Sequence, residues 1–139
     1  MKLNTRARYA VRMMADIYKN SNGDDPIPLN QVAARQNISK RYLDQLATHL
    51  KNAQLLKSVW GMNGGYKLNK PGGEITVLEI LEAVEGPVSI IDCVGEPGAC
   101  AQGGDCDCRV MWSDVNKTLV DKLANYTLDD LVKPRRKKR

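Results

Sequence analysis

Two short amphipathic helices separated by a tight turn, predicted over residues 29–51, constrain the fold of this chain more than any other feature. Asn37 stands between them, where the backbone must pass through a left-handed conformation that Asn tolerates better than most residues. Ser39 is a favourable N-cap for the second helix. The predicted buried face of that helix recurs at helical spacing and comprises Leu43, Leu46, Ala47 and Leu50. This arrangement is typical of a helix-turn-helix.

The opposite face of the second helix is polar and is predicted to face outward. Side chains on such a face can hydrogen-bond to the edges of bases in a DNA groove. With the capping Ser39, the predicted DNA-binding residues of this helix are Lys40, Arg41, Asp44, Gln45 and Thr48. Because any amphipathic helix pair has a polar face, the helices alone leave a purely structural interpretation open.

A Gly-rich β-hairpin is predicted directly after these helices. The segments LLKSVW and YKL flank a tip over residues 61–65, in which Asn-Gly and the other glycines favour a turn. A helix-turn-helix followed by a hairpin is the order of elements in a winged helix, where the hairpin reaches toward the DNA backbone or the minor groove beside the recognition helix. The hairpin residues predicted to bind DNA are Lys57, Trp60 and Asn63.

Helices are also predicted before and after this module. An N-terminal helix begins near Asn4, which is a favourable cap, and carries an apolar face at helical spacing. The sequence Pro-Gly-Gly at 71–73 ends the module. Thr76 and Glu79 then have the spacing of a capping box and predict the start of another helix. The predicted fold class is mainly α, a winged helix-turn-helix with a two-stranded wing and a long C-terminal helix.

The C-terminal helix is predicted over about residues 110–126. Its apolar stripe consists of Trp112, Val115, Leu119 and Leu123. A small domain has little core left for a long helix at its end, so we interpret this helix as a dimerisation element, with packing inside the monomer as the alternative. We therefore divide the chain into a winged-helix DNA-binding domain (1–73), a segment with the cysteines and dimerisation helices (74–132), and a basic tail (133–139) predicted to be disordered.

Charge follows the same division. Residues 1–73 carry 12 Lys and Arg against 4 acidic residues, residues 74–132 carry 3 against 12, and the tail carries 6 against none. A basic half followed by an acidic half indicates that the first half faces a polyanion, here double-stranded DNA, although an accidental asymmetry of a solvated surface gives the same numbers. We do not expect an enzyme, because the sequence has no Ser-His-Asp set and no phosphate-binding loop.

Four cysteines lie close together in a loop rich in Gly and Pro, and the rest of the chain has none. They are Cys93, Cys100, Cys106 and Cys108. Arginines interrupt the apolar N-terminal stretch, so no signal peptide is predicted and we expect a cytoplasmic protein with no membrane partner. In a reducing cytosol, grouped cysteines bind metal or react with oxidants more often than they form structural disulfides.

The chemistry of thiolates narrows the choice of metal. Soft thiolate ligands select iron-sulfur clusters, zinc or copper(I). The gaps between these cysteines are wider than the Cys pairs usual in zinc sites. We therefore predict that Cys93, Cys100, Cys106 and Cys108 hold an iron-sulfur cluster with two or four irons. Redox-active thiols without metal, and zinc, are the alternatives.

Taken together, these segments resemble the IscR-type regulators of the Rrf2 family of bacterial winged-helix transcription factors, which also includes NsrR, RirA and CymR. The resemblance covers residues 1 to about 132. It is carried by KLNTRARYAVRMM, PLNQVAARQNISKRYLDQL, VWGMNGGYKL, ITVLEILEAVEG and TLDDLV, and by three cysteines followed by Trp112. It implies a homodimeric transcription regulator, a repressor or a dual regulator, that binds a palindromic operator. It also implies a cysteine-ligated cluster that reports iron-sulfur status, oxygen or nitric oxide.

The resemblance further implies roles for single residues. The family's three cluster cysteines correspond to Cys93, Cys100 and Cys106. Positions of the recognition helix that relatives use on DNA correspond to Ser39, Arg41 and Gln45. Asp44 occupies an acidic position at which, in IscR-like members, the choice of operator depends on cluster occupancy.

The chain departs from the family pattern at three positions. Arg109 stands where IscR has a histidine ligand, and its guanidinium cannot deprotonate to bind metal, so Cys108 is the natural replacement unless another group completes the site. Arg8 stands where NsrR-like members use an aspartate of the other subunit. Trp60 stands where relatives commonly place an arginine in the minor groove. A thiol-redox DNA-binding regulator without a cluster and an electron-transfer iron-sulfur protein remain alternative functions.

Overall fold

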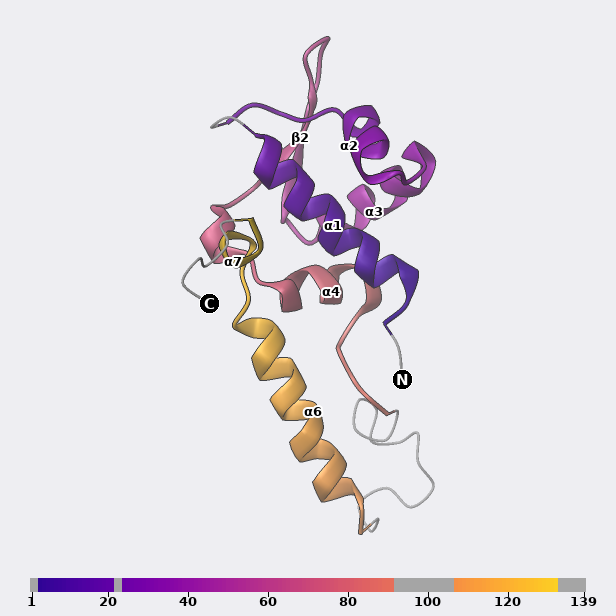
Figure 1. The fold of residues 1–139 in the computed structure, drawn as a ribbon, viewed down its shortest axis with the longest axis vertical. Helices are drawn as coiled ribbons and strands as arrows, with labels where there is room; N and C mark the ends of the chain where they lie inside the picture. Colours follow the sequence, from indigo (N-terminus) through magenta and orange to yellow (C-terminus); the bar gives the residue numbers. More distant parts are fainter. Residues whose placement is uncertain (1–2, 22–23, 92–106, 133–139) are drawn as a thin grey trace.

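The computed structural model describes residues 3–21, 24–91 and 107–132. Its helices and strands follow the predicted order (Figure 1), so the mainly helical winged-helix fold with a two-stranded antiparallel wing is confirmed. The elements are α1 (Thr5–Asn20), α2 (Leu29–Gln36), α3 (Lys40–Asn52), β1 (Leu56–Val59), β2 (Gly65–Leu68), the 3₁₀ helix η1 (Gly72–Glu74), α4 (Val77–Glu85), α6 (Arg109–Ala124) and α7 (Leu128–Val132). None of the helices within the described ranges has the length and hydropathy of a membrane span.

Local sequence signals set the ends of the first three helices. The Asn4 side chain accepts a hydrogen bond from the Ala7 amide at 2.9 Å and caps α1. Asn37 ends α2 with a φ of 56°, the left-handed conformation that its side chain tolerates. The Ser39 hydroxyl oxygen accepts from the Tyr42 amide at 3.1 Å and caps α3. The predicted helix-turn-helix therefore forms at the predicted residues.

The wing turns within the predicted tip. The strands pair in register from Leu56 opposite Leu68 to Val59 opposite Gly65, which leaves residues 60–64 as the loop. The turn spans Gly61 to Gly64, with Met62 and Asn63 at its centre, and Gly61 has a φ of +112°. Its closing hydrogen bond runs from the Gly64 amide to the Gly61 carbonyl at 3.0 Å. Position 64 requires glycine for a different reason, since a Cβ there would lie 2.1 Å from the Val59 carbonyl oxygen.

The chain returns to the body after α6 through a short pairing that the sequence did not predict. The Val77 amide donates to the Tyr126 carbonyl at 2.8 Å, and the Leu128 amide donates to the Ile75 carbonyl at 3.0 Å. This pairing places α7 beside η1 and α1, where the Tyr18 hydroxyl donates to the Asp129 carboxylate. The predicted capping box of α4 forms within the same segment.

One hydrophobic core joins α1, α2, α3, β1 and α4, and its central side chains are fully buried. Leu128 from α7 belongs to the same core and has no exposed surface. The predicted domain boundary at residue 73 therefore separates proposed functions along the chain. The hydrophobic core contains residues from both sides of it. We call the unit formed by α1–α4, the wing, η1 and α7 the body.

Candidate nucleic-acid interface and cysteine segment

The polar face of α3 is exposed along its whole length, as predicted. Its exposed side chains include Lys40, Arg41, Asp44, Gln45 and Thr48. Within the described part of the chain, neither Arg41 nor Gln45 has a hydrogen-bond or ion-pair partner. Side chains with several unused donors and acceptors on a rigid helix are suited to reading the edges of bases.

Contacts within α3 orient the remaining polar groups. Lys40 Nζ lies 3.3 Å from Asp44 Oδ2, and both side chains are more than half exposed. Thr48 Oγ1 donates to the Asp44 carbonyl at 3.1 Å. Such exposed pairs contribute little stability. Their effect is on side-chain position, because Asp44 holds the Lys40 ammonium group against the helix surface.

An ion pair with a buried carboxylate fixes α2, the first helix of the pair, against α1. The Asp16 carboxylate is almost fully buried and accepts from Arg35 Nη2 at 2.7 Å and from Gln36 Nε2 at 2.8 Å. The hydrogen bond to Asp16 raises the pKa of Arg35. Sequence reasoning missed this pair. The available signal was the position of Asp16 on the apolar face of α1, between Met13 and Ile17.

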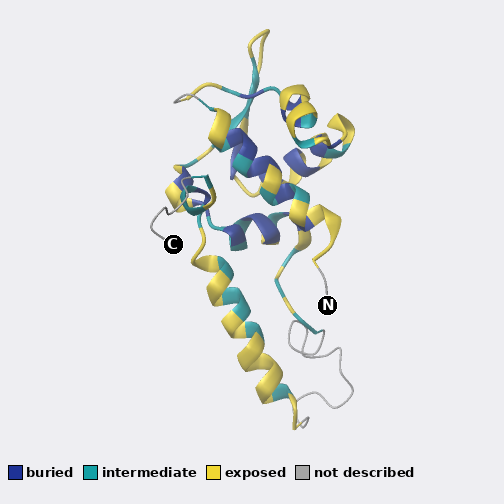
Figure 2. Cartoon of the chain, viewed as in Figure 1, coloured by how far each residue is buried: buried dark blue, intermediate teal, exposed yellow. Residues whose placement is uncertain are grey.

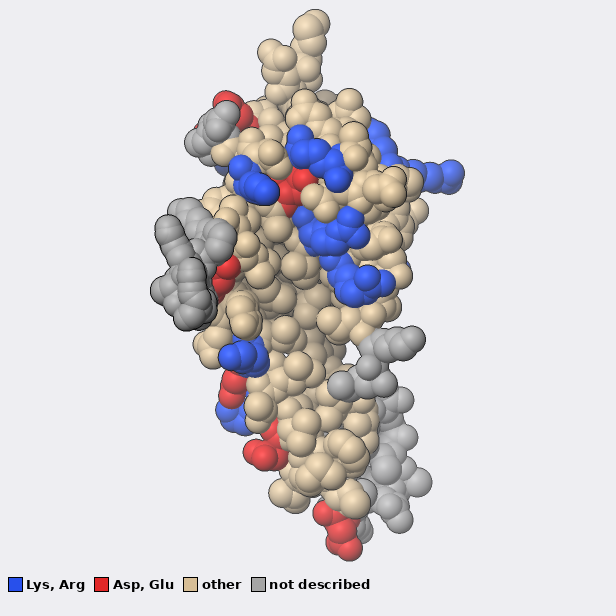
Figure 3. Space-filling view, in the orientation of Figure 1, with Lys and Arg blue, Asp and Glu red and all other residues tan. Residues whose placement is uncertain are grey.

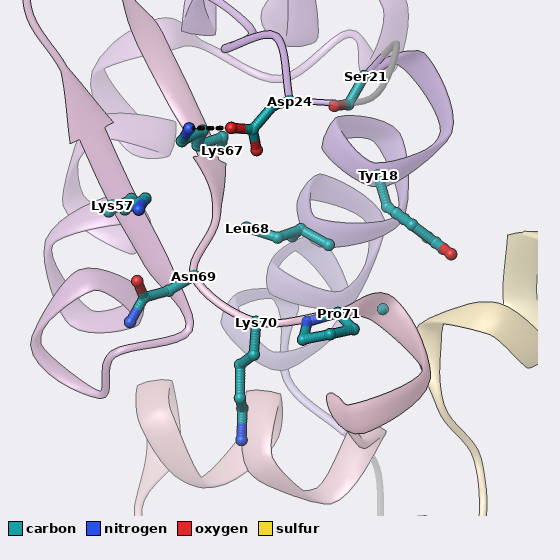
Figure 4. A pocket seen from close by; sticks show the side chains of 10 residues that line it. Tyr18, Ser21, Asp24, Lys57, Lys67, Leu68, Asn69, Lys70 and Pro71 are labelled. Carbon is teal, nitrogen blue, oxygen red and sulfur yellow. Dashed lines mark hydrogen bonds and ion pairs between the residues drawn. The ribbon is translucent and has the colours of Figure 1, made fainter.

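The wing carries the three predicted DNA-binding residues Lys57, Trp60 and Asn63, and all are exposed. At the base of the wing, a recess of about 490 Å³ is lined by Lys57, Lys67, Lys70 and Asp24 (Figure 4). Lys67 is directly opposite Lys57 in the strand ladder, where like charges repel. The Asp24 carboxylate, 2.7 Å from Lys67 Nζ, offsets this repulsion. The hydrogen bond and charge of Lys67, with a smaller contribution from Lys57, lower the pKa of Asp24.

Charge is distributed unevenly over the described surface. In the view of Figure 3, Lys and Arg gather over the body, whereas α6 carries both basic and acidic side chains. Several of the basic side chains project from α1 and from the helix pair, including Arg8, Arg12, Arg35, Lys40 and Arg41. This gathering of positive charge favours contact between the body and a polyanion.

Only one of the four predicted cluster ligands lies in the described residues. Cys93, Cys100 and Cys106 fall outside them. Cys108 is the N-cap residue of α6, and its thiol is exposed, free and not used as a helix cap. Within the described ranges no three potential metal-binding side chains come together. An uncommitted thiol next to a segment with three more cysteines has the donor chemistry that iron-sulfur clusters require, so the residues fit such a group.

The predicted dimerisation helix α6 has no buried residue. It extends away from the body (Figure 1), and its side chains are exposed or half-exposed along its length (Figure 2). Exposed apolar side chains on α6 include Val110, Met111, Trp112 and Val115. Its C-terminal end meets the body, where Leu123 packs near Ala7, Val77 and Leu81. In the middle of the helix, Asn116 accepts from the Ile90 amide at 2.9 Å and donates to the Val88 carbonyl at 3.4 Å. An apolar groove of about 430 Å³ at this junction continues to Leu3 and Leu131.

Comparison with known proteins decides the family. The sequence profile of Rrf2, described as an iron-dependent transcriptional regulator, matches residues 3–134. This chain belongs to the Rrf2 family. It is therefore a DNA-binding transcriptional regulator, as its relatives in this family are named. No catalytic family is indicated by these similarities.

Single relatives agree with this assignment. The chain is 40% identical over 132 residues to the HTH-type transcriptional regulator IscR of Cronobacter sakazakii, a match that covers 95% of this chain and 80% of the relative. The structure is similar to that of CymR from B. subtilis, with a TM-score of 0.81 and 30% identity over 96% of this chain and 97% of CymR. It is also similar to IscR of T. potens, with a TM-score of 0.78 and 29% identity over 100% of this chain and 92% of that protein.

Proposed function

We propose that this Rrf2-family regulator is a cytoplasmic homodimer that binds a palindromic operator and senses iron-sulfur status, oxygen or nitric oxide through a cysteine-ligated iron-sulfur cluster. It acts as a repressor or as a dual regulator. The observation that carries the DNA-binding part is the exposed polar face of α3 beside an exposed wing. The residues assigned to DNA are Ser39, Lys40, Arg41, Asp44, Gln45, Thr48, Lys57, Trp60 and Asn63.

The recognition helix α3 reads the operator in the major groove. The Gln45 amide can donate to and accept from one adenine, and the Arg41 guanidinium can donate twice to one guanine. Asp44 accepts from cytosine and repels a phosphate that approaches too closely, which gives it a role in choosing between operators. Lys40, Thr48 and the hydroxyl of Ser39 are placed for backbone contacts that set the register of the helix.

The DNA-binding assignment is tested by Gln45→Ala. Loss of a bidentate base contact costs about 1 to 3 kcal/mol on the operator and little on random DNA. Deletion of residues 135–139 is the matched control, because removing tail charges weakens binding to all sequences alike and reduces the salt slope. Equal losses on operator and random DNA for Gln45→Ala would contradict the assignment of base reading.

Dimerisation is supported by α6, whose apolar side chains Val110, Met111, Trp112 and Val115 are exposed in the monomer. A two-fold dimer presents two α3 helices to successive major grooves about 34 Å apart, which matches a palindromic operator. The apolar groove at the foot of α6 lies next to this helix and adds apolar surface to the same interface. Sedimentation of the protein across concentrations measures this association directly.

The proposed cluster ligands are Cys93, Cys100, Cys106 and Cys108. Support comes from the four-thiolate donor set, from the exposed and uncommitted thiol of Cys108, and from the similarity to IscR proteins. A bound iron-sulfur cluster supplies a redox-active centre that reacts with oxygen and nitric oxide. Arg109 follows Cys108 on α6. It carries a fixed positive charge and therefore cannot act as a ligand.

Anaerobic isolation tests this proposal. We expect a brown protein with iron and labile sulfide in comparable amounts, and Cys108→Ala should fold and bind DNA but hold the cluster poorly. Operator affinity of the holo and apo proteins should differ by a coupling of about 1 to 3 kcal/mol. A Cys108→Ala variant that keeps a full cluster with unchanged spectra would place the fourth ligand elsewhere. A colourless protein with stoichiometric zinc would contradict the cluster.

A second candidate function is regulation by reversible thiol oxidation. It is favoured by the free, exposed Cys108 and by the similarity to CymR, described as the global cysteine regulator of B. subtilis. Under this candidate, the anaerobic protein is colourless and its operator affinity changes with oxidation and recovers with a thiol reductant. An electron-transfer protein, the remaining alternative, would not bind an operator in its apo form.

A further inference from the structure

We propose that the wing tip inserts two apolar side chains, Trp60 and Met62, into the minor groove beside the major groove that α3 reads, and that they wedge open a base step there. The inference rests on the proposed function, since it requires α3 on DNA. It adds a second site of DNA recognition, at which the wing tip makes apolar contacts and not charged ones.

The first observation is the exposure of these two side chains. Trp60 is 90% exposed and Met62 is 97% exposed, the highest values among the exposed large apolar residues of the described chain. The hairpin carries them beyond the rest of the body (Figure 1 and Figure 3). Single exposed apolar residues are ordinary in soluble proteins, but two at one projecting tip form a patch with a function to explain.

The second observation is that this patch has no apolar neighbour to complete it within its own loop. The other exposed apolar side chains lie along α6 or line the groove at its foot, where a second copy can cover them. The tip is separated from that surface by the length of the body (Figure 2). Its loop neighbours are Gly61, Asn63 and Gly64, so the dimer interface proposed above does not account for it.

The third observation is that the tip is built to hold its shape. The strand ladder reaches Val59 and Gly65, immediately outside the loop. The hydrogen bond between the Gly64 amide and the Gly61 carbonyl closes the turn. Position 64 lies so close to the Val59 carbonyl that there is no space for a Cβ. A loop fixed in this way presents its side chains with little loss of conformational entropy on binding.

The position and charge of the tip indicate DNA as its partner. The wing follows α3 directly in the chain, and β1 packs against α3. With α3 in a major groove, the neighbouring feature along the duplex is a minor groove. The loop from residue 60 to 64 has no charged side chain, so it cannot bind by neutralising phosphates. Apolar side chains, Met among them, do enter minor grooves and partly unstack a base step.

The remaining hairpin residues complement such a wedge. Asn63 lies between the two apolar side chains and the closing glycine, and its amide can donate to the acceptors on the floor of the minor groove. Lys57 is exposed lower on the same hairpin, where it can contact the phosphate backbone. A wedge favours steps that unstack easily, so we expect a TA or CA/TG step in the flank of each half-site.

The test uses the full-length protein and a duplex of about 30 base pairs selected by the wild type from a random library, long enough for two half-sites. A 2-aminopurine at the flanking step reports unstacking, and end-to-end energy transfer reports bending. We expect Trp60→Ala and Met62→Ala to lower affinity by about tenfold, to reduce both signals and to leave the salt slope unchanged.

Two further variants separate apolar contact from charge. Trp60→Phe should retain most of the affinity and the 2-aminopurine signal, because it keeps an aromatic wedge. Trp60→Arg should lose the 2-aminopurine signal and increase the salt slope by about one contact. Thermal unfolding of each variant controls for folding, which we expect to be unchanged because both side chains are almost fully exposed.

The outcomes distinguish this inference from the proposed function. If the wild type does not distinguish the selected duplex from random DNA, sequence-specific binding fails and the wedge fails with it. If the wild type does discriminate, but Trp60→Ala and Met62→Ala bind and bend the duplex as it does, the wedge alone is overturned and the tip belongs to a protein partner.

Discussion

The body buries its apolar residues, whereas α6 leaves its own apolar residues exposed or partly exposed. In the body, the apolar faces of α1, α3 and α4 meet in one core, and their central side chains are fully buried. In α6, an apolar stripe of the same helical spacing buries nothing completely. The same sequence pattern is thus satisfied within the chain in one region and left for a partner in the other. A hydrophobic stripe predicts that a face will be covered, but it does not say by which molecule.

The largest expected effect on the free energy of unfolding comes from truncating one leucine in each of the two regions. Leu46→Ala in α3 should lower the free energy of unfolding by about 2 to 5 kcal/mol, because it leaves a cavity in a closed core. Leu119→Ala in α6 should have a smaller effect that grows as protein concentration rises, since the partner that we propose for it is a second copy. Urea unfolding at two concentrations measures both. A loss for Leu119→Ala that is large and independent of concentration would place α6 in the monomer's own core.

The next effect concerns assembly. Val115→Asp places a charge on the exposed apolar stripe of α6 and should dissociate the proposed dimer while the body stays folded. Operator affinity should then fall by about a hundredfold, because the two half-sites are no longer bound by linked modules. Ser113→Asp on the same helix is the matched control. A dimer of unchanged affinity after Val115→Asp would exclude this stripe from the interface.

Two ion pairs extend the comparison, with smaller expected changes in the free energy of unfolding. Asp16→Ala removes the buried partner of Arg35 and Gln36 in the body and should cost about 2 to 3 kcal/mol. Asp121→Ala removes an exposed partner of Lys117 on α6 and should cost about 0.3 to 0.5 kcal/mol. Thermal unfolding of the two variants compares them. Equal losses would show that burial is not what distinguishes the pairs.

The smallest effect is a pH dependence at the cap of α4. Although partial burial raises the pKa of Glu79, hydrogen bonds from the Thr76 amide and from Lys70 Nζ, each at 3.0 Å, outweigh it and lower the pKa overall. Because the folded pKa lies below the unfolded value of about 4.3, Glu79 stabilises the fold above that value, and the contribution is lost as pH falls through the folded pKa.

Glu79→Gln keeps the amide acceptor of the capping box and removes the titration. Unfolding free energies measured from about pH 6 to pH 3 should therefore converge for wild type and variant at the acid end, after a difference of about 0.5 kcal/mol at pH 6. A difference that stays constant across this range would mean that the carboxylate charge contributes nothing to the cap.

Sequence reasoning predicted most of the body because its signals are local. The caps at Asn4, Ser39 and Thr76, the left-handed Asn37 and the helical spacing of apolar residues each act within one or two turns of chain, and all formed as predicted. The turn of the wing also lies within the predicted tip, where the Gly64 amide donates to the Gly61 carbonyl. What the local pattern did not predict is that the Val59 carbonyl excludes a side chain at position 64.

The candidate site was predictable to the extent that it is a helix face. The exposed residues of α3 follow from amphipathicity, and the grouped cysteines are visible in the sequence alone. The lysine-lined recess at the wing base was not predictable, because it brings together Asp24, Lys57 and Lys67 from segments separated by more than one element. Neither was the isolation of Trp60 and Met62, since exposure is a property of the whole surface.

The sequence by itself determined the order of the elements, the ends of the helices and the face of α3 that remains polar, because backbone capping and hydrophobic periodicity depend on neighbouring residues. The tertiary structure decided three things that residues distant in sequence create together. It buried Asp16 beneath Arg35, it returned residues 126–128 to pair with residues 75–77, and it left α6 outside the core. Each results from competition for a limited buried volume, which no single segment of the chain specifies.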